Sequence, residues 1–296
     1  MTTIPANLSD FLFWVKEQTE LFWSIDPKTS TNDFVCEEWA YGAKWIGLTD
    51  EQIDQVEAKY EIRFLPEHRE FLRILHTIDR RERIEYEDDD EIVVKERPFF
   101  YNWLEDEAEI KRRLNWPFET IFEDVEGANK FWLKSWGVKP KTYEEKKEIF
   151  TRWYNQAPKL LPLTSHRFIV SDPNLQFRPV LSVYGSDTIV YGWDLRTYLL
   201  NELQDHLNVY KAVFDEEDDC YYAELEEEAA LILKNDNAYN EAKIIPYWQD
   251  VILYWSSGWS SFGLEFPRKN GDLIQPIVKA DQSEDDENEQ KTFTGF

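Results

Sequence analysis

The spacing of apolar residues predicts helices near the start of the chain. Leu8, Phe11, Leu12 and Val15 recur on one helical face, and Ser9 or Asp10 could cap it, so we predict a helix over residues 8–23.

Two further helices are predicted by their capping residues. Thr49 and Gln52 have the spacing of a capping box, in which each side chain satisfies a free backbone donor of the other residue. Pro66 suits the first position of a second helix. We expect these helices to form an antiparallel pair through the apolar residues Ile53, Val56, Tyr60, Phe71, Leu72, Leu75 and Ile78.

The stretch from Pro179 to Leu203 predicts a β-hairpin followed by a helix, around which we expect the fold to be arranged. Two β-prone runs at 180–184 and 189–191 flank turn residues, and Asp194 is a suitable helix cap. Neither run alternates strictly between apolar and polar residues. This pattern predicts burial on both faces and a position at the centre of a sheet, with residues 166–170 as a neighbouring strand.

Aromatic-rich segments precede this hairpin. A helix is predicted to begin near Asn102 and to end at Pro117, because proline lacks the N–H group that a helix interior needs. Residues 121–125 and 131–136 are predicted to be extended, and Thr142 begins a second capping box and another helix.

Acidic residues gather in blocks. The block at 85–91 predicts a solvated loop, because like charges repel each other. The block at 224–228 is expected at the N-terminal end of a helix, where the helix dipole favours anions. Residues 244–255 are expected to be buried, and the tail 280–296 to be disordered, since it has little apolar surface to bury.

The composition limits the classes of partner. The chain has 296 residues and a formal net charge of −26. Such a surface repels phosphate backbones and anionic lipids, so we expect neither nucleic acid nor membrane as a partner, whereas a basic protein would be attracted. The aromatic content of 16% predicts a core built largely from rings. We assign Trp103, Trp116, Trp132 and Trp136 to that core rather than to a stacking surface.

No pattern of catalytic or metal-binding residues emerges. His68, His76 and His166 lack ligands or catalytic partners at suitable spacing, and we interpret them as structural. Asp88 and Asp90 resemble a calcium loop, but the glycine and glutamate that complete it are missing. We therefore predict no cofactor and no enzymatic activity.

Cysteine content and the N-terminal sequence bear on location. Cys36 and Cys220 are the two cysteines, far apart in sequence, which favours a reducing compartment. The first 20 residues mix acids with apolar residues, unlike a signal peptide, and no stretch has the ~20 apolar residues of a membrane span. We expect a cytoplasmic protein.

Several segments resemble, in order, the SUKH superfamily of bacterial immunity proteins and fungal cell-wall assembly regulators. The helix pair LTDEQIDQVEAKY and FLPEHREFLRILH lies within residues 48–76, and the more specific stretches are PLTSHRF at 162–168 and PVLSVYGSDTIVYG at 179–192. The resemblance covers roughly residues 48–255. It implies an α+β fold with a mostly antiparallel sheet packed on helices, and no known enzymatic activity.

This resemblance divides the chain into an extension at 1–47, a SUKH-like domain at 48–279 and the tail. Many members of the superfamily bind and block toxins, often nucleases. Neither the acidic blocks nor the extension maps onto a family motif, so the identity of a partner does not carry over.

The leading hypothesis is a non-catalytic immunity protein that neutralises a basic toxin, possibly a nuclease, through acidic surface clusters. The alternative is an acidic scaffold that binds several cellular proteins. A hydrolase using paired carboxylates is a third possibility, but among 59 acidic residues some pair always occurs. The candidate partner-binding residues are Glu87, Asp88, Asp89, Asp90, Asp215, Glu216, Glu217, Asp218 and Asp219.

Overall fold

A computed structural model places eight helices, a 3₁₀ turn and twelve strands among the residues that it describes, in an α+β arrangement with antiparallel strand pairing. It describes residues 3–31, 35–88, 91–207, 209–215, 220–236, 243–254, 268–269 and 272–273. The tail 280–296, for which we predicted disorder, lies outside the described residues.

The largest sheet has four antiparallel strands in the order β5-β6-β7-β8. Their bounds are Lys159–Thr164, Arg167–Ser171, Val180–Tyr184 and Asp187–Gly192. Each strand pairs with the next one along the chain, so the sheet is a meander held by short connections.

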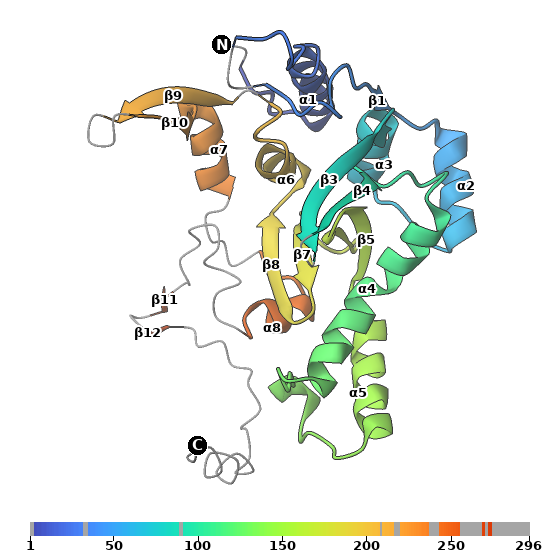
Figure 1. Cartoon of the computed structure of the whole chain (residues 1–296). Helices are drawn as coiled ribbons and strands as arrows, with labels where there is room; N and C mark the ends of the chain where they lie inside the picture. Colours follow the sequence, from blue (N-terminus) through green and yellow to red (C-terminus); the bar gives the residue numbers. More distant parts are fainter. Residues whose placement is uncertain are drawn as a thin grey trace.

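Both faces of this sheet are covered by helices (Figure 1). On one side lie α1 (Leu8–Phe22), α3 (Pro66–Leu75) and α6 (Leu195–Glu202), and on the other lie α4 (Glu107–Glu126), α5 (Tyr143–Gln156) and α8 (Trp248–Ile252). Successive residues of a strand point to opposite faces. Ile169 of β6 accordingly joins one hydrophobic cluster, while its neighbours Phe168 and Val170 join the other.

The predicted hairpin and its helix are confirmed as β7, β8 and α6. Burial on both faces is also confirmed, because four of the five residues of β7 are buried. The predicted central position is wrong for β8, which is an outer strand of the sheet. Helix α6 approaches β8 closely at Gly192, where a Cβ atom would lie 2.5 Å from the Tyr198 nitrogen. The side chain of Asp194 caps α6 as predicted, by accepting a hydrogen bond from the Thr197 N–H.

The three N-terminal helices are confirmed. Both hydrogen bonds of the Thr49–Gln52 capping box are present at the start of α2 (Asp50–Tyr60), and Pro66 is the first residue of α3. The cap of α1 is Asn7 rather than Ser9 or Asp10: its side chain accepts a hydrogen bond from the Asp10 N–H. Local capping chemistry therefore predicts these helix starts to within a residue or two.

The predicted end of a helix at Pro117 is wrong, since α4 continues through this residue to Glu126. The segment 121–125 is consequently helical and not extended. Ile110, Pro117, Ile121 and Val125 are all buried, at spacings that keep them on one helical face. Packing of this apolar face outweighs the loss of one backbone hydrogen bond at proline.

The segment 131–136 is not the predicted strand either. It ends in a 3₁₀ turn, η1 (Lys134–Trp136), in which Trp136 is buried against the rings of Phe150 and Trp153. The helix predicted after Thr142 is confirmed as α5, and the Thr142 hydroxyl accepts a hydrogen bond from the Glu145 N–H.

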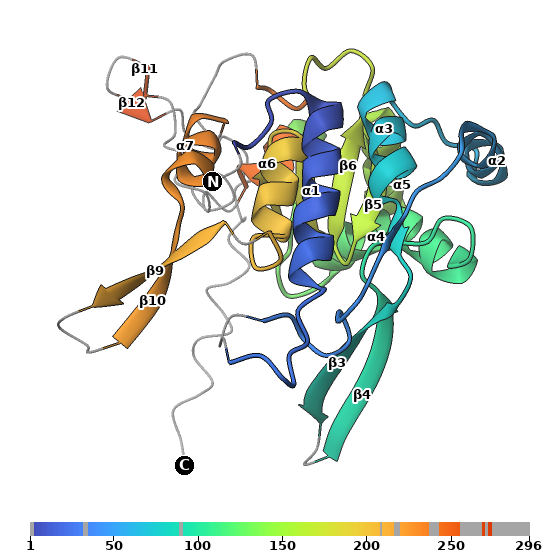
Figure 2. The same cartoon turned by 90° about the horizontal axis from the view of Figure 1, so that it is seen from above.

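Two antiparallel ribbons, each a separate two-stranded sheet, extend away from the body of the molecule (Figure 2). One consists of β3 (Arg81–Asp88) and β4 (Glu91–Pro98), and the other of β9 (Tyr210–Asp215) and β10 (Cys220–Leu225). The predicted acidic loop at 85–91 is therefore wrong for its described residues, which belong to β3 and β4.

The remaining elements are short or lie near the end of the chain. Helix α7 (Glu227–Asp236) begins at the acidic block as predicted, and α8 lies in the segment predicted to be buried. Two small sheets complete the set: β1 (Trp45–Ile46) with β2 (Thr77–Ile78), and β11 (Arg268–Lys269) with β12 (Asp272–Leu273). Within the described residues, no helix combines the length and apolarity of a membrane span.

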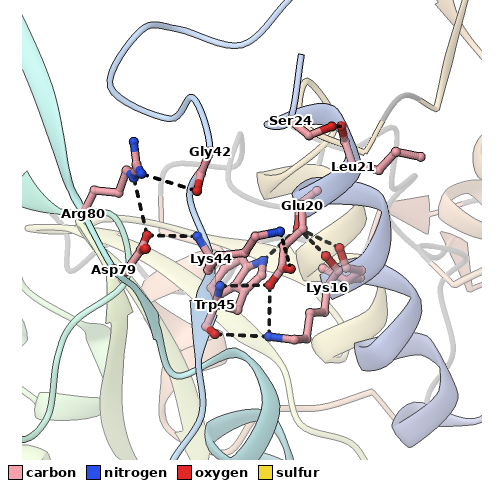
Figure 3. Close-up of polar contacts among 11 residues, drawn as sticks. Lys16, Glu20, Leu21, Ser24, Gly42, Lys44, Trp45, Asp79 and Arg80 are labelled. Carbon is pink, nitrogen blue, oxygen red and sulfur yellow. Dashed lines mark hydrogen bonds and ion pairs between the residues drawn. The ribbon is translucent and has the colours of Figure 1, made fainter. Parts of the chain in front are cut away.

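A group of polar contacts fastens the N-terminal helix to β1 (Figure 3). Glu20 of α1 accepts hydrogen bonds from the Trp45 backbone N–H at 3.1 Å and from the Lys44 ammonium at 3.0 Å. The Lys16 ammonium donates to the Trp45 carbonyl at 3.1 Å. Partial burial acts to raise the pKa of Glu20, but the hydrogen bonds from Lys16, Lys44 and Trp45 together hold it below its usual range.

Two buried histidines on and after α3 should make the stability depend on pH. Burial lowers the pKa of His68 to about 3 and that of His76 to about 4, while an exposed histidine in the unfolded chain titrates near ~6.5. Between these values the unfolded chain binds more protons, so stability falls as the pH drops. We expect each histidine to remove about 2 kcal/mol of unfolding free energy between pH 7 and pH 5, measured by urea denaturation.

Substituting the two histidines should have different effects on the free energy of unfolding at pH 7. His68 packs 4.6 Å from the Phe64 ring, and its Nε2 has no hydrogen-bond partner among the described residues. The His68→Phe variant should therefore have the same free energy of unfolding as the wild type at pH 7. Between pH 7 and pH 5 it should lose about 2 kcal/mol less than the wild type. His76 Nε2 accepts a hydrogen bond from the Trp103 N–H at 2.9 Å, so His76→Phe should cost about 1–3 kcal/mol at pH 7. Equal effects of the two substitutions would contradict these assignments.

Candidate functional site

One face of α4 and the β7–β8 turn enclose a pocket of about 610 Å³. Helix α4 supplies Trp116, Glu119, Thr120, Glu123 and Asp124, whose spacing places them on a single face of the helix. The remaining walls are Asn129 and the turn residues Tyr184, Gly185, Ser186 and Asp187.

The β7–β8 turn is held against α4 by Asp124. The Asp124 carboxylate accepts hydrogen bonds from the Ser186 backbone N–H at 2.5 Å and from the Ser186 hydroxyl at 2.6 Å. The Gly185 N–H donates to the Thr120 hydroxyl at 3.2 Å. The turn requires glycine here, because Gly185 has a φ of 61° and a Cβ atom would lie 2.4 Å from the Asp124 carboxylate.

Two aromatic rings form the apolar part of the pocket. The ring centroids of Trp116 and Tyr184 lie 6.0 Å apart, within the range of favourable aromatic pairs. The Trp116 indole N–H donates to the Val183 carbonyl at 3.0 Å, which fixes the ring against β7. Tyr184 is 66% exposed, so its ring is accessible to a partner.

Three exposed carboxylates also line the pocket. Glu119, Glu123 and Asp187 are exposed, and no ion pair joins any of the three to another described residue. Arg112 and Arg113 lie over the Trp116 ring, and both pair with Glu109. The pocket therefore combines an aromatic wall with carboxylates that form no ion pair with a described residue, which suits a cationic group.

The pattern of apolar residues alone does not predict this pocket. The prediction that Pro117 ends the helix separates Trp116 from Glu119 to Asp124, although in the structure these residues share one helical face. The sequence does carry one indication of the pocket: residues 116, 119, 120, 123 and 124 have the spacing of one helical face. Of the four tryptophans assigned to the core, Trp103, Trp132 and Trp136 are buried, and Trp116 is the partly exposed exception.

Those residues predicted to bind a partner that the structure describes lie on the two ribbons. Glu87 is exposed near the end of β3, Asp88 is the last residue of β3, and Asp215 is the last residue of β9. Asp89, Asp90, Glu216, Glu217, Asp218 and Asp219 lie outside the described residues. The ribbons extend in different directions in Figure 2, so the described parts of the two clusters do not come together.

A serine–histidine contact at the β5–β6 turn is the arrangement most similar to a catalytic pair within the described residues. Ser165 Oγ lies 3.0 Å from His166 Nδ1. Burial, reinforced by the nearby positive charges of Arg167, Arg113 and Arg97, lowers the pKa of His166 to about 4. An imidazole with so low a pKa is a weak general base at neutral pH.

Metal binding lacks a comparable arrangement. In the described part of the chain, no group of three or more histidine, cysteine or acidic side chains is placed to hold a metal ion.

Comparisons with known proteins do not assign the chain to a family: searches of protein-family models, curated proteins and solved structures found no match.

The attachment of the turn to α4 can be tested by its effect on stability. Asp124→Ala would remove the acceptor of two hydrogen bonds from the buried Ser186, so we expect a loss of about 1–3 kcal/mol in the free energy of unfolding. Asp187→Ala is the matched control, because this exposed carboxylate makes no hydrogen bond within the described residues. The control should change stability by less than about 0.5 kcal/mol in the same denaturation experiment.

Proposed function

We propose that this protein is a non-catalytic binding protein for a basic protein partner, and that the partner is a toxin which it neutralises. The observation that carries the proposal is the pocket on α4, where Trp116 and Tyr184 lie beside three carboxylates without an ion-pair partner among the described residues. A lysine or arginine side chain could contact the rings through its aliphatic part and the carboxylates through its charged end.

The net charge supports the same class of partner. A charge of −26 attracts a basic protein from a distance and accelerates its association at low salt. It also disfavours nucleic acid, since both molecules are then strongly negative. A toxin that degrades nucleic acid needs a basic surface to bind its substrate. A protein that occupies that surface would therefore block the toxin.

The resemblance to the SUKH superfamily remains part of this proposal. The two stretches that carry most of it lie in the four-stranded sheet: 162–168 forms the β5–β6 turn region, and 179–192 forms the β7–β8 hairpin that contributes the pocket rim. In this proposal the superfamily segments build the scaffold, and the acidic residues on it provide the affinity for the partner.

The proposal predicts that the pocket carboxylates matter more than other carboxylates. The triple variant Glu119→Gln, Glu123→Gln, Asp187→Asn should weaken binding of the partner by about tenfold or more at low salt. A matched triple variant, Glu17→Gln, Glu51→Gln, Glu144→Gln, removes the same charge from exposed positions elsewhere and should change affinity by less than about twofold.

The partner is first isolated by co-purification with the tagged protein from the cell that makes it, with washes at low and high salt. Affinities for the isolated partner are then measured by titration calorimetry. A single basic protein that inhibits growth, and whose toxicity is relieved by co-expression, supports the proposal. Several unrelated proteins would support the acidic scaffold instead, and equal loss of affinity in the two triple variants would remove the pocket from the binding site.

A further inference from the structure

The two faces of the β3–β4 ribbon differ. Register pairs Glu82 with Arg97 and Tyr86 with Val93 on one face. On that face Arg97 makes two hydrogen bonds to the Glu82 carboxylate, at 2.6 and 2.9 Å, and the Lys95 ammonium lies 4.9 Å from the Tyr86 ring centroid. The polar and aromatic groups of this face therefore satisfy one another.

The opposite face is open. Register pairs Glu85 with Val94 and Glu87 with Ile92, so these four side chains project together from the other side of the ribbon. Ile92 is 75% exposed and Val94 is 45% exposed, and both glutamates are also exposed. We call these four residues, with Arg83 and Glu96 at the ribbon's base, the open face.

The open face carries two parallel stripes. Val94 and Ile92 form an aliphatic stripe on β4, and Glu85 and Glu87 form an acidic stripe on β3, about 4.8 Å away. Of the three carboxylates on this face, Glu85 pairs with Arg83 at 2.7 Å, so the face keeps a net negative charge. Among the described residues no third strand joins this ribbon. An exposed aliphatic stripe on a two-stranded ribbon, which is only marginally stable alone, favours a partner that covers it.

The spacing of the stripes fits an amphipathic helix. Alternate residues of a strand repeat at about 6.7 Å, close to the ~6 Å rise between residues i and i+4 of a helix. A helix can carry an aliphatic stripe directly beside a basic one, whereas an extended segment alternates its side chains between opposite faces. A helix can therefore contact both stripes at once.

We propose that the open face of the β3–β4 ribbon binds an amphipathic helix of another protein, with lysine or arginine residues beside its aliphatic stripe. Charge complementarity favours this occupant over a second copy of this chain, which would bring carboxylates against carboxylates. The inference shares one premise with the proposed function, that the partner is basic, but it concerns a different surface from the pocket.

The probe is a synthetic helix of about 14 residues, roughly four turns, with leucine at every third or fourth position and lysine beside each leucine. A second peptide has alanine in place of leucine, which preserves charge and helix propensity but removes the aliphatic stripe. Affinities for the full-length protein are measured by fluorescence anisotropy at low and high salt.

Three variants separate the contributions. Ile92→Ser with Val94→Ser should weaken binding of the leucine peptide by about tenfold and leave the alanine peptide unaffected. Glu85→Gln with Glu87→Gln should weaken binding of both peptides at low salt, and the difference should shrink as salt is raised. Glu17→Gln with Glu51→Gln removes the same charge from exposed positions outside the ribbon and the pocket, and should leave both affinities unchanged.

The inference is overturned if the serine variant binds the leucine peptide as tightly as the wild type. It is also overturned if the control variant Glu17→Gln with Glu51→Gln loses as much affinity as the glutamate variant of the ribbon. Thermal unfolding of each variant checks folding, and we expect little change because the substituted side chains are exposed. If the triple variant of the pocket loses partner binding while the ribbon variants keep peptide binding, the proposed function stands and the ribbon site is rejected.

Discussion

Burial of the four-stranded sheet on both faces is the constraint on which the rest of the structure depends. Residues Phe168 to Val170 of β6 alternate between two hydrophobic clusters, so neither cluster can form without the strand being placed correctly for the other. The same alternation fixes the register, since a slip of one residue would exchange the two faces. Helices from both halves of the chain are consequently held in fixed positions around one sheet.

The pocket is rigid because its walls belong to that sheet and to a helix packed on it. Its acidic wall belongs to α4, which packs on the sheet, and its rim is the turn between two strands of the sheet itself. The Asp124 carboxylate joins the two through Ser186. In the proposed function, a partner's cation would meet carboxylates and rings already in position, which would reduce the ordering cost of binding.

Sequence rules succeeded where local chemistry decides the outcome and were wrong where tertiary packing decides it. Thr49, Pro66 and Asp194 predict helix starts because the groups they satisfy lie within one turn. Pro117 misled the prediction because burial of the apolar face of α4 outweighs a local defect. The acidic block at 85–91 was predicted to be a loop from self-repulsion alone. Cross-strand pairs such as Glu82 with Arg97 stabilise a ribbon there, and nothing in the local pattern shows which distant residue is the partner.

The separation of the ribbons from the core has a consequence for how this protein can diverge. Each ribbon is its own sheet and adds little to either hydrophobic cluster, so most substitutions on its exposed side chains should leave folding stability nearly unchanged. The residues of the central sheet have no such freedom. Substitutions on a ribbon surface could therefore change what the proposed ribbon site binds while leaving the scaffold intact.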